Sequence, residues 1–427
     1  MSVVWEAPLN PLDFGATWDG TTDDSGAIQD CLDAAATALQ VTSTDTGGDV
    51  YLPPGRPVVN QGLVLNNTTS RVSIRGSGRL TTTLRRTSGT ATMLAVSGST
   101  SGRGRASIEG VTLNGGGSAG TLLDLVRASD VLVDDVKLTN TDGNALHCKQ
   151  VFNSHINNLW VSEAGTGTTA AAVLFDGFDE NQGASDTVFG VNWQLEANTG
   201  TDVKMTGAGT FPTNKVFLTN LKIEGGSGAF PCIDLPYAQI AMTNVSIGNV
   251  AGRTVTPVQQ VGSANFYPNI FQNLGIDGTQ PYLVDHAQGR LTIIGGLMNG
   301  WTTAAVRIQG SVPAGYFVSA GLTGGGGQFG PTLFLDGRTP KEYPQWLRGS
   351  VAWDPQNLVT GTGETKPCTV TGAVLGDKAI ASMDVDLQGV ILHAWVSAAD
   401  TVTARLFNNT GTDKNIAAGT LRAEIRR

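Results

Sequence analysis

A six-residue arrangement of hydrophobic positions recurs through the middle of the chain. It has the form apolar-x-x-apolar-x-apolar and begins at Ile108, Val133, Ile156, Gly190, Leu218, Met242, Phe271 and Ile293, with Gly190 in place of the first apolar residue. We align its fourth positions as Val111, Val136, Leu159, Trp193, Leu221, Val245, Leu274 and Leu297, at intervals of 25, 23, 34, 28, 24, 29 and 23 residues. Alternating β-branched residues and scarce helical periodicity make this repeat typical of the coils of a parallel β-helix, rather than of a leucine-rich repeat.

Asparagine precedes the fourth position on five successive coils, at Asn158, Asn192, Asn220, Asn244 and Asn273. Asparagine tolerates the left-handed backbone conformation of a tight bend, and its amide can hydrogen-bond to a neighbour stacked above it. We therefore expect an asparagine ladder along one corner of the β-helix. The residues that flank this corner then have a defined inward or outward direction.

One segment near the N-terminus has a helical pattern. Polar residues over 22–25 offer N-cap oxygens, and apolar residues follow at Ile28, Leu32, Ala35, Ala36 and Leu39. A short amphipathic helix here would cover the open first coil, whose unpaired backbone edge otherwise favours aggregation.

The coil pattern stops after a glycine-rich segment, and short alternating strands begin near residue 356. Five such strands in about 70 residues indicate a small antiparallel β-sandwich. The predicted organisation is an all-β chain with an N-terminal tether (1–12), a parallel β-helix (13–335), a linker (336–355) and a C-terminal β-sandwich module (356–427).

Composition restricts the classes of partner. The 427 residues include 27 Lys and Arg against 36 Asp and Glu, a formal net charge of −9, and no basic stripe that would bind nucleic acid. No apolar run approaches the ~20 residues that span a bilayer, so membrane insertion is not expected. The N-terminus shows no secretory signal, which predicts synthesis and folding in a cytoplasm. The dispersed Cys31, Cys148, Cys232 and Cys368 favour buried thiols.

Motifs at both ends of the chain resemble known proteins. The segments Asp13-Phe-Gly-Ala, Asp19-Gly-Thr-Thr-Asp-Asp-Ser and Gly47-Gly-Asp-Val-Tyr-Leu-Pro-Pro-Gly resemble the N-terminal signature of the pectate-lyase-like right-handed β-helix superfamily, which is common in bacteriophage tailspikes. The segments around Leu375, Val396 and Ala418 are similar to a C-terminal module of phage tail proteins. The resemblance implies a homotrimer in the virion tail, in contact with other tail proteins and with host surface polysaccharide.

Outward residues of the repeat supply the candidate chemistry. Glu196 and Glu224 follow the last apolar residue on successive coils, and Asp277 holds the same place two coils beyond Glu224. Coils stack ~4.7–4.9 Å apart, so the two glutamates fit the ~5–5.5 Å spacing of a retaining glycosidase, and Glu224 with Asp277 approaches the ~9.5 Å limit of an inverting one. The candidate catalytic residues are Glu196, Glu224 and Asp277. The candidate substrate-binding residues are Trp160, Glu163, Gln194 and Lys222.

Several alternatives remain open at this point. Outward charged residues on a β-helix are commonly a solvated ladder, and Trp160 suits a trimer interface as well as a sugar. Three functions fit the sequence. The first is a phage tailspike or tail fibre that binds host surface polysaccharide and, in one version, depolymerises it. The others are a non-catalytic receptor-binding or structural tail protein and a bacterial polysaccharide lyase or hydrolase.

Weaker candidates lie elsewhere in the chain. Asp142 and His147 lie in and just after an Asn-Thr-Asp-Gly segment, and Asp234, Asp285 and Arg290 offer a loose set of groups for calcium-dependent lyase chemistry. The four histidines lack metal-ligand spacing, so no metal or other cofactor is expected.

Overall fold

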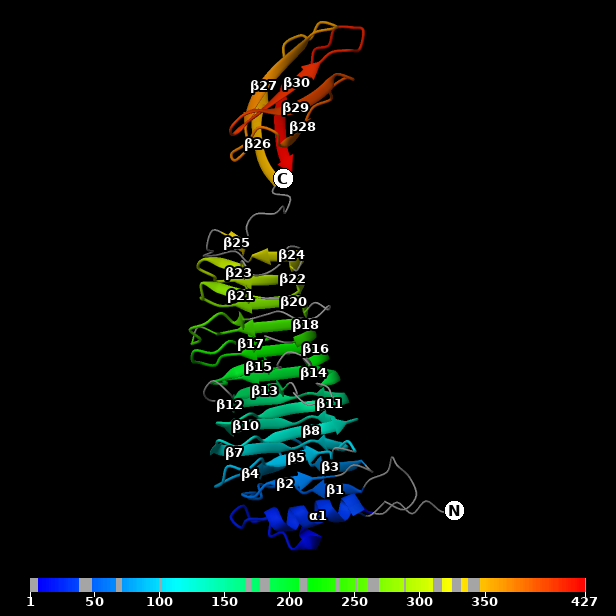
Figure 1. Cartoon of the computed structure of the whole chain (residues 1–427), viewed down its shortest axis with the longest axis vertical. Coiled ribbons are helices and arrows are strands. Elements are labelled where there is room, and N and C mark those ends of the chain that lie inside the picture. Colours follow the sequence, from blue (N-terminus) through cyan, green and yellow to red (C-terminus); the bar gives the residue numbers. More distant parts are fainter. Residues whose placement is uncertain are drawn as a thin grey trace, which may run out of the picture. The chain divides into compact units, whose positions relative to one another are not determined.

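The architecture was obtained as a computed structural model. It describes residues 7–37, 48–66, 71–99, 102–165, 170–176, 185–206, 213–235, 238–250, 252–259, 269–287, 289–309, 317–324, 332–336 and 346–426. The chain divides into two compact units, Met1–Arg338 and Thr339–Arg427. In the first unit, 25 described strands pair in parallel from coil to coil, as the stacked arrows of Figure 1 show. The repeat pattern thus correctly predicted a parallel β-helix.

Parallel pairing arranges the strands in three stacks, which we call faces A, B and C. Face A contains β4 (Thr83–Arg85), β7 (Thr112–Ser118), β10 (Lys137–Thr141), β12 (Trp160–Ala164) and the second halves of β14 (Asp186–Glu196), β16 (Thr213–Glu224), β18 (Ala238–Gly248), β20 (Asn269–Asp277), β22 (Leu291–Asn299) and β24 (Phe317–Gly324). This is the face on which the sequence places the candidate residues.

Face B is the second of the three stacks. It contains β2 (Leu63–Leu65), β5 (Leu94–Ser97), β8 (Leu123–Ser129), the first half of β11 (Leu146–Asn157), β13 (Ala171–Asp176), β15 (Thr201–Met205), β17 (Ile233–Asp234), β19 (Val258–Gln259), β21 (Tyr282–His286), β23 (Ala304–Ile308) and β25 (Thr332–Asp336). Face C contains β1 (Asp49–Leu52), β3 (Val72–Gly76), β6 (Ala106–Glu109), β9 (Leu132–Asp134), the second half of β11 and the first halves of β14, β16, β18, β20, β22 and β24.

The asparagine column marks the corner between faces C and A, as expected. Its five members have φ between 50° and 59°, in the left-handed region. Each side-chain amide donates to the asparagine one coil earlier, at 2.9 to 3.1 Å, and Asn158 begins the ladder by donating to Asp134 at 2.8 Å. The ladder therefore holds the outward directions of the adjoining strands in register.

The alignment is wrong by one residue in the coil that ends at Asn299. Leu274 pairs with Gly296, whereas Leu297 pairs with Gly275 on the outer surface, where 46% of its area is exposed. Gly295 takes the left-handed corner position there, with φ 68°, since glycine adopts this conformation without an asparagine side chain.

Inward residues of all coils form one continuous hydrophobic core. Trp193 explains the missing apolar residue at Gly190: its buried indole donates to Ile156 O at 2.7 Å, and a Cβ at Gly190 would lie 2.7 Å from the ring. The described cysteines are free and buried, as predicted.

The N-terminal helix α1 spans Ser25–Thr37 and buries Ile28, Cys31, Leu32 and Ala35 against the first coil. Leu39 lies outside the described residues. A short 3-10 helix, η1 (Pro11–Phe14), precedes α1, and Leu9 pairs with Val50 of β1, although the sequence placed Leu9 in a tether. The position of α1 over the first coil confirms the predicted helical cap.

The C-terminal unit contains two three-stranded antiparallel sheets. One consists of β26 (Trp346–Trp353), β31 (Gly419–Arg426) and β28 (Lys378–Met383), and the other of β27 (Gly363–Thr369), β30 (Thr401–Phe407) and β29 (Ile391–Ala398). β26 lies in the segment expected to be a linker, yet it pairs with β31 along its full length. Among the described residues, no helix has the length and apolar character needed to cross a membrane.

Candidate functional site

Face A brings four of the predicted site residues together on two adjacent coils. Gln194 pairs with Lys222, and Glu196 pairs with Glu224, between β14 and β16. We call these four residues the acidic cluster. Both strands leave the asparagine corner in the same direction, so the alternation of side chains places all four on the outer surface.

Polar contacts link the members of the acidic cluster. The Lys222 ammonium hydrogen-bonds to Glu224 and lies 4.0 Å from Glu196, and the Gln194 amide donates to Glu196. The hydrogen bond that Lys222 donates to Glu224 raises the pKa of Lys222, so this cation stays charged between two carboxylates. The side chain of Glu196 is 26% exposed and those of Lys222 and Glu224 are 52% and 44% exposed, so a ligand can reach all three.

Trp160 lies next to the acidic cluster, since it pairs with Gln194 on one side and Lys137 on the other. The Lys137 ammonium lies 3.8 Å from the centroid of its ring, and the Arg79 guanidinium lies 5.6 Å away. The half-buried indole therefore already makes cation–π contacts, and a sugar that stacks on the ring must share it with these cations.

Glu163 and Asp277 lie apart from the acidic cluster. Glu163 is exposed near the end of β12, with a left-handed φ of 55°, one residue beyond Ser162, the partner of Glu196. Asp277 is exposed and pairs with Asn299, and Gly248 occupies the intervening coil beside Glu224. The structure thus groups Glu196 with Glu224 and leaves Asp277 two coils away.

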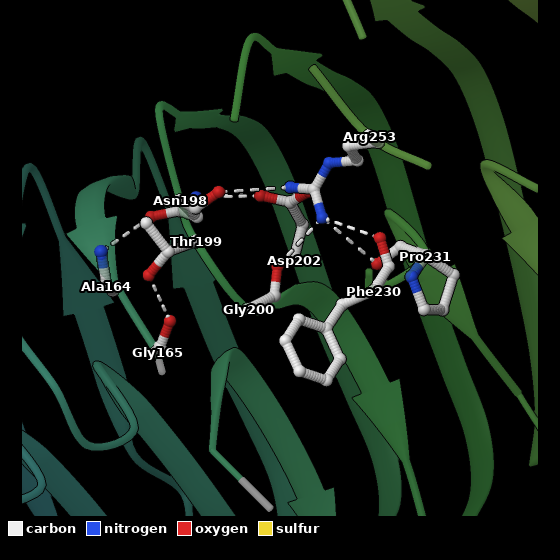
Figure 2. A network of polar contacts seen from close by, with 9 residues as sticks. All are labelled: Ala164, Gly165, Asn198, Thr199, Gly200, Asp202, Phe230, Pro231 and Arg253. Carbon is white, nitrogen blue, oxygen red and sulfur yellow. Dashed lines mark hydrogen bonds and ion pairs between the residues drawn. The ribbon is translucent and has the colours of Figure 1, made fainter. Parts of the chain in front are cut away.

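A buried network fixes the backbone that follows Glu196. Arg253 donates to Asp202 at 2.6 Å, to Asn198 O at 3.3 Å and to Gly200 O and Phe230 O at 2.9 and 3.0 Å, as Figure 2 shows. The Asn198 side chain accepts a hydrogen bond from Ala164 N at 3.0 Å. Because Asn198 comes two residues after Glu196, the network ties the bends beside the acidic cluster to three coils.

Burial affects the titration of this network. It raises the pKa of Asp202 to about 6, while the Arg253 charge and the hydrogen bond from Asn198 oppose the rise. Asp202 and Arg253 have side-chain exposures of only 1% and 0%, so we assign them a structural role.

A second polar group lies on face B. His147 Nδ1 is 2.8 Å from Asp124 Oδ1 on one neighbouring coil, and Nε2 is 3.7 Å from Asp176 Oδ2 on the other. Burial alone lowers the pKa of His147, but the hydrogen bond to Asp124 and the negative charges of Asp124 and Asp176 outweigh it and place the pKa at about 9. The imidazolium is therefore charged at neutral pH. The sequence offered His147 only as a weak candidate with Asp142, which is an exposed turn residue.

The loose calcium candidates do not form a cation site. Asp285 accepts hydrogen bonds from Arg307 and from Gln309, at 3.0 Å from each residue, which satisfies its carboxylate without a metal. Burial raises the pKa of Asp234, a property that opposes metal binding. No metal-ligating cluster of three or more His, Cys, Asp or Glu residues occurs in the part of the chain that the structure describes. The polar contacts of His147 and of Asp285 on face B join residues of separate coils. The six-residue repeat covers a different strand of each coil and does not predict them.

Comparison with known proteins supports the fold. Residues 9–115 match the family model described as rhamnogalacturonase A/epimerase, pectate lyase-like. No curated protein sequence gives a significant match.

Solved structures match the chain at low identity. ORF18 of Geobacillus virus E2 is 15% identical, with 97% of this chain and 76% of that chain covered and a TM-score of 0.50. An alginate lyase from a Paenibacillus species is 15% identical over 73% and 95% of the two chains, with a TM-score of 0.47. A tailspike protein of the E. coli bacteriophage HK620 is 12% identical over 98% and 93%, with a TM-score of 0.43. The coil architecture and the solved structures show that the chain has the parallel β-helix fold, and its residues 9–115 are similar to a pectate lyase-like family model.

Proposed function

We propose that this protein is a component of a phage virion tail that binds polysaccharide on the host cell surface through face A. The observation that carries the proposal is the acidic cluster, in which an amide, an ammonium and two carboxylates share one exposed surface on adjacent coils. The sequence motifs at both ends of the chain, which resemble phage tail proteins, support the virion location and contacts with other tail proteins.

The chemistry of the acidic cluster suits a hydroxyl-rich polymer. Glu196 and Glu224 accept hydrogen bonds from sugar hydroxyls, while Lys222 and Gln194 donate. Ser246 continues the column on the next coil and is exposed. A chain of sugars that lies along the stacked coils would therefore meet two polar pairs about 4.8 Å apart and then the Ser246 hydroxyl on the next coil.

Cleavage of the bound polysaccharide is the second candidate function. The observation that favours it is the pairing of Glu196 with Glu224, because carboxyl groups on adjacent strands approach the ~5–5.5 Å separation of a retaining glycosidase. One carboxyl group would then act as acid and base and the other as nucleophile.

The two functions are separated by binding and product assays on the same protein. We expect purified protein to bind glycans extracted from the host surface, and Lys222→Met and the Glu196→Gln/Glu224→Gln double variant to bind at least tenfold more weakly. Asn299→Ala is the matched control, because Asn299 lies on the same face A but is separated from Glu224 by the coils of Gly248 and Asp277. Unchanged binding by both cluster variants would refute the proposal.

Reducing ends released by the wild type, and abolished by Glu196→Gln or Glu224→Gln, would establish hydrolysis. Release of unsaturated uronates would instead indicate a lyase. Binding without either product would identify the protein as a receptor-binding tail part.

Face C supports assembly as a homotrimer. Its outward column, which we call the apolar lane, contains the stacked rings of His155, Phe189 and Phe217, with centroids 5.1 and 5.3 Å apart. It continues through Ala241, Ile270 and one polar residue, Thr292, to Val318. Phe217 is 39% exposed and Val318 is 52% exposed. Because this apolar lane follows the stacked coils, further copies of the chain in parallel alignment would cover it along its length.

A further inference from the structure

The outer surface of the sheet β27–β30–β29 carries a second cluster of side chains suited to a ligand. Phe407 pairs with Ile391, Arg405 with His393 and Thr403 with Trp395, so all six side chains lie on one surface. The opposite surface of this sheet contributes Val396, Val402, Ala404 and Leu406 to the hydrophobic core of the unit. The outward residues are therefore not needed to fill that core.

Aromatic groups dominate this surface. The rings of His393 and Trp395 lie 5.7 Å apart at 31°, and the Arg405 guanidinium lies 5.3 Å from the centroid of Phe407. His393, Trp395, Arg405 and Phe407 line a hollow of about 380 Å³. This volume is at the lower end of the range for small-molecule sites, which combine apolar walls with a few polar groups.

The charge of this surface is opposite to that of the whole protein. The chain carries a net charge of −9, yet the outward positions of β27, β30 and β29 include the cation Arg405 and no Asp or Glu. Arg405 is exposed, and its guanidinium lies over the ring of Phe407. A guanidinium in this setting is well suited to the bidentate binding of a carboxylate.

Gly363 keeps the space beside the guanidinium open. It pairs with Phe407, and a Cβ at this position would lie 3.0 Å from Arg405 Nε and 2.5 Å from Leu406 O. Any larger residue would therefore press on the Arg405 side chain or on the backbone beneath it.

We propose that this surface, which we call the C-terminal aromatic face, is a second saccharide site and is selective for a carboxylated sugar unit. The indole of Trp395 contacts the apolar C–H face of the pyranose ring, and Arg405 pairs with its carboxylate. The site is separate from the acidic cluster on face A. Because the acidic cluster contains two carboxylates and the C-terminal aromatic face contains a guanidinium, the two surfaces favour different sugar units.

Titration calorimetry with the full chain tests this proposal. The probes are trigalacturonate and its methyl ester, in which each negatively charged carboxylate is replaced by a neutral ester. We expect trigalacturonate to bind more tightly than the ester, with an affinity that falls as salt is raised. Trp395→Ala should weaken binding of both probes at least tenfold. Arg405→Gln should remove the preference for the free acid. Gly363→Val should reduce this preference, because the larger side chain presses on Arg405.

Ile380→Ala is the matched control, because Ile380 is 58% exposed on the other sheet of the unit. A photoreactive trigalacturonate should label peptides from β29 and β30, in wild type and in the Glu196→Gln/Glu224→Gln variant alike. Labelling confined to face A, or affinities unchanged by Trp395→Ala and Arg405→Gln, would overturn the proposal. A change in sedimentation of these two variants without a change in binding would show that the surface is instead a contact between copies.

Discussion

The guanidinium of Arg253 and the carboxylate of Asp202 meet at 2.6 Å inside the β-helix, where neither side chain reaches solvent. We expect Arg253→Met to destabilise the β-helix by about 3–5 kcal/mol, because Asp202 is left as a buried group without its counter-ion. Urea unfolding followed by circular dichroism measures the loss. Lys215→Met is the control, since its ion pair with Asp186 is 54% and 29% exposed and should cost less than about 1 kcal/mol. Equal midpoints for the two variants would contradict the structural role of the network.

The asparagine ladder predicts different effects for two substitutions at Asn220. Glycine adopts the left-handed conformation found there, φ 59°, so Asn220→Gly loses only the ladder hydrogen bonds, at about 1 kcal/mol. Asn220→Ala should cost a further ~1–2 kcal/mol, because alanine has a Cβ that disfavours this conformation. Thermal unfolding of both variants gives the comparison. If the alanine variant is as stable as the glycine variant, the bend does not require the left-handed conformation.

His147 predicts a loss of stability in alkaline solution. Its pKa of about 9 in the folded protein exceeds the ordinary value of 6.5, so its contribution is complete below pH 6.5 and is lost as the pH rises through 9. The pKa difference corresponds to at most about 3 kcal/mol. The free energy of unfolding of the wild type should fall between pH 7 and 10, and that of His147→Gln should change much less. Parallel curves for the two proteins would show that the Asp124–His147–Asp176 contacts do not stabilise the fold.

The apolar lane on face C predicts the interface of the proposed homotrimer. Phe217→Asp places a charge within the apolar lane, and we expect it to sediment as a monomer at concentrations where the wild type is a trimer, because burial of the unpaired carboxylate is costly. Ser246→Asp introduces the same charge on the exposed surface of face A and should leave the trimer intact. A Phe217→Asp variant that remains trimeric would exclude face C as the interface.

Much of the acidic cluster could be located from the repeat alone. Each coil contacts only its neighbours, so alignment of the repeat also aligns the strands in space. Glu196 and Glu224 therefore occupy paired positions in the structure as they do in the alignment. The same procedure failed at Leu297, because two successive glycines replace the asparagine and the following apolar residue and shift the apparent match by one position.

The repeat does not predict contacts between residues that lie outside its six positions, because the segments that join the strands differ in length from coil to coil. Asp202 and Arg253 lie 51 residues apart, outside the six-residue pattern, and meet because the intervening coils bring their bends together. His147 gains its two carboxylate neighbours from separate coils in the same manner. In the C-terminal unit, His393 and Arg405 share a surface because β29 and β30 are antiparallel in a particular register.

The coil repeat, the inward core and the asparagine corner can be predicted from the amino-acid pattern, because period-2 alternation and stacking of like residues are local properties of each coil. The folded chain is needed to show which polar side chains meet across coils, which aromatic rings remain exposed and which charges are buried. These outcomes depend on distances between residues remote in the chain, and an alternating pattern carries no record of them.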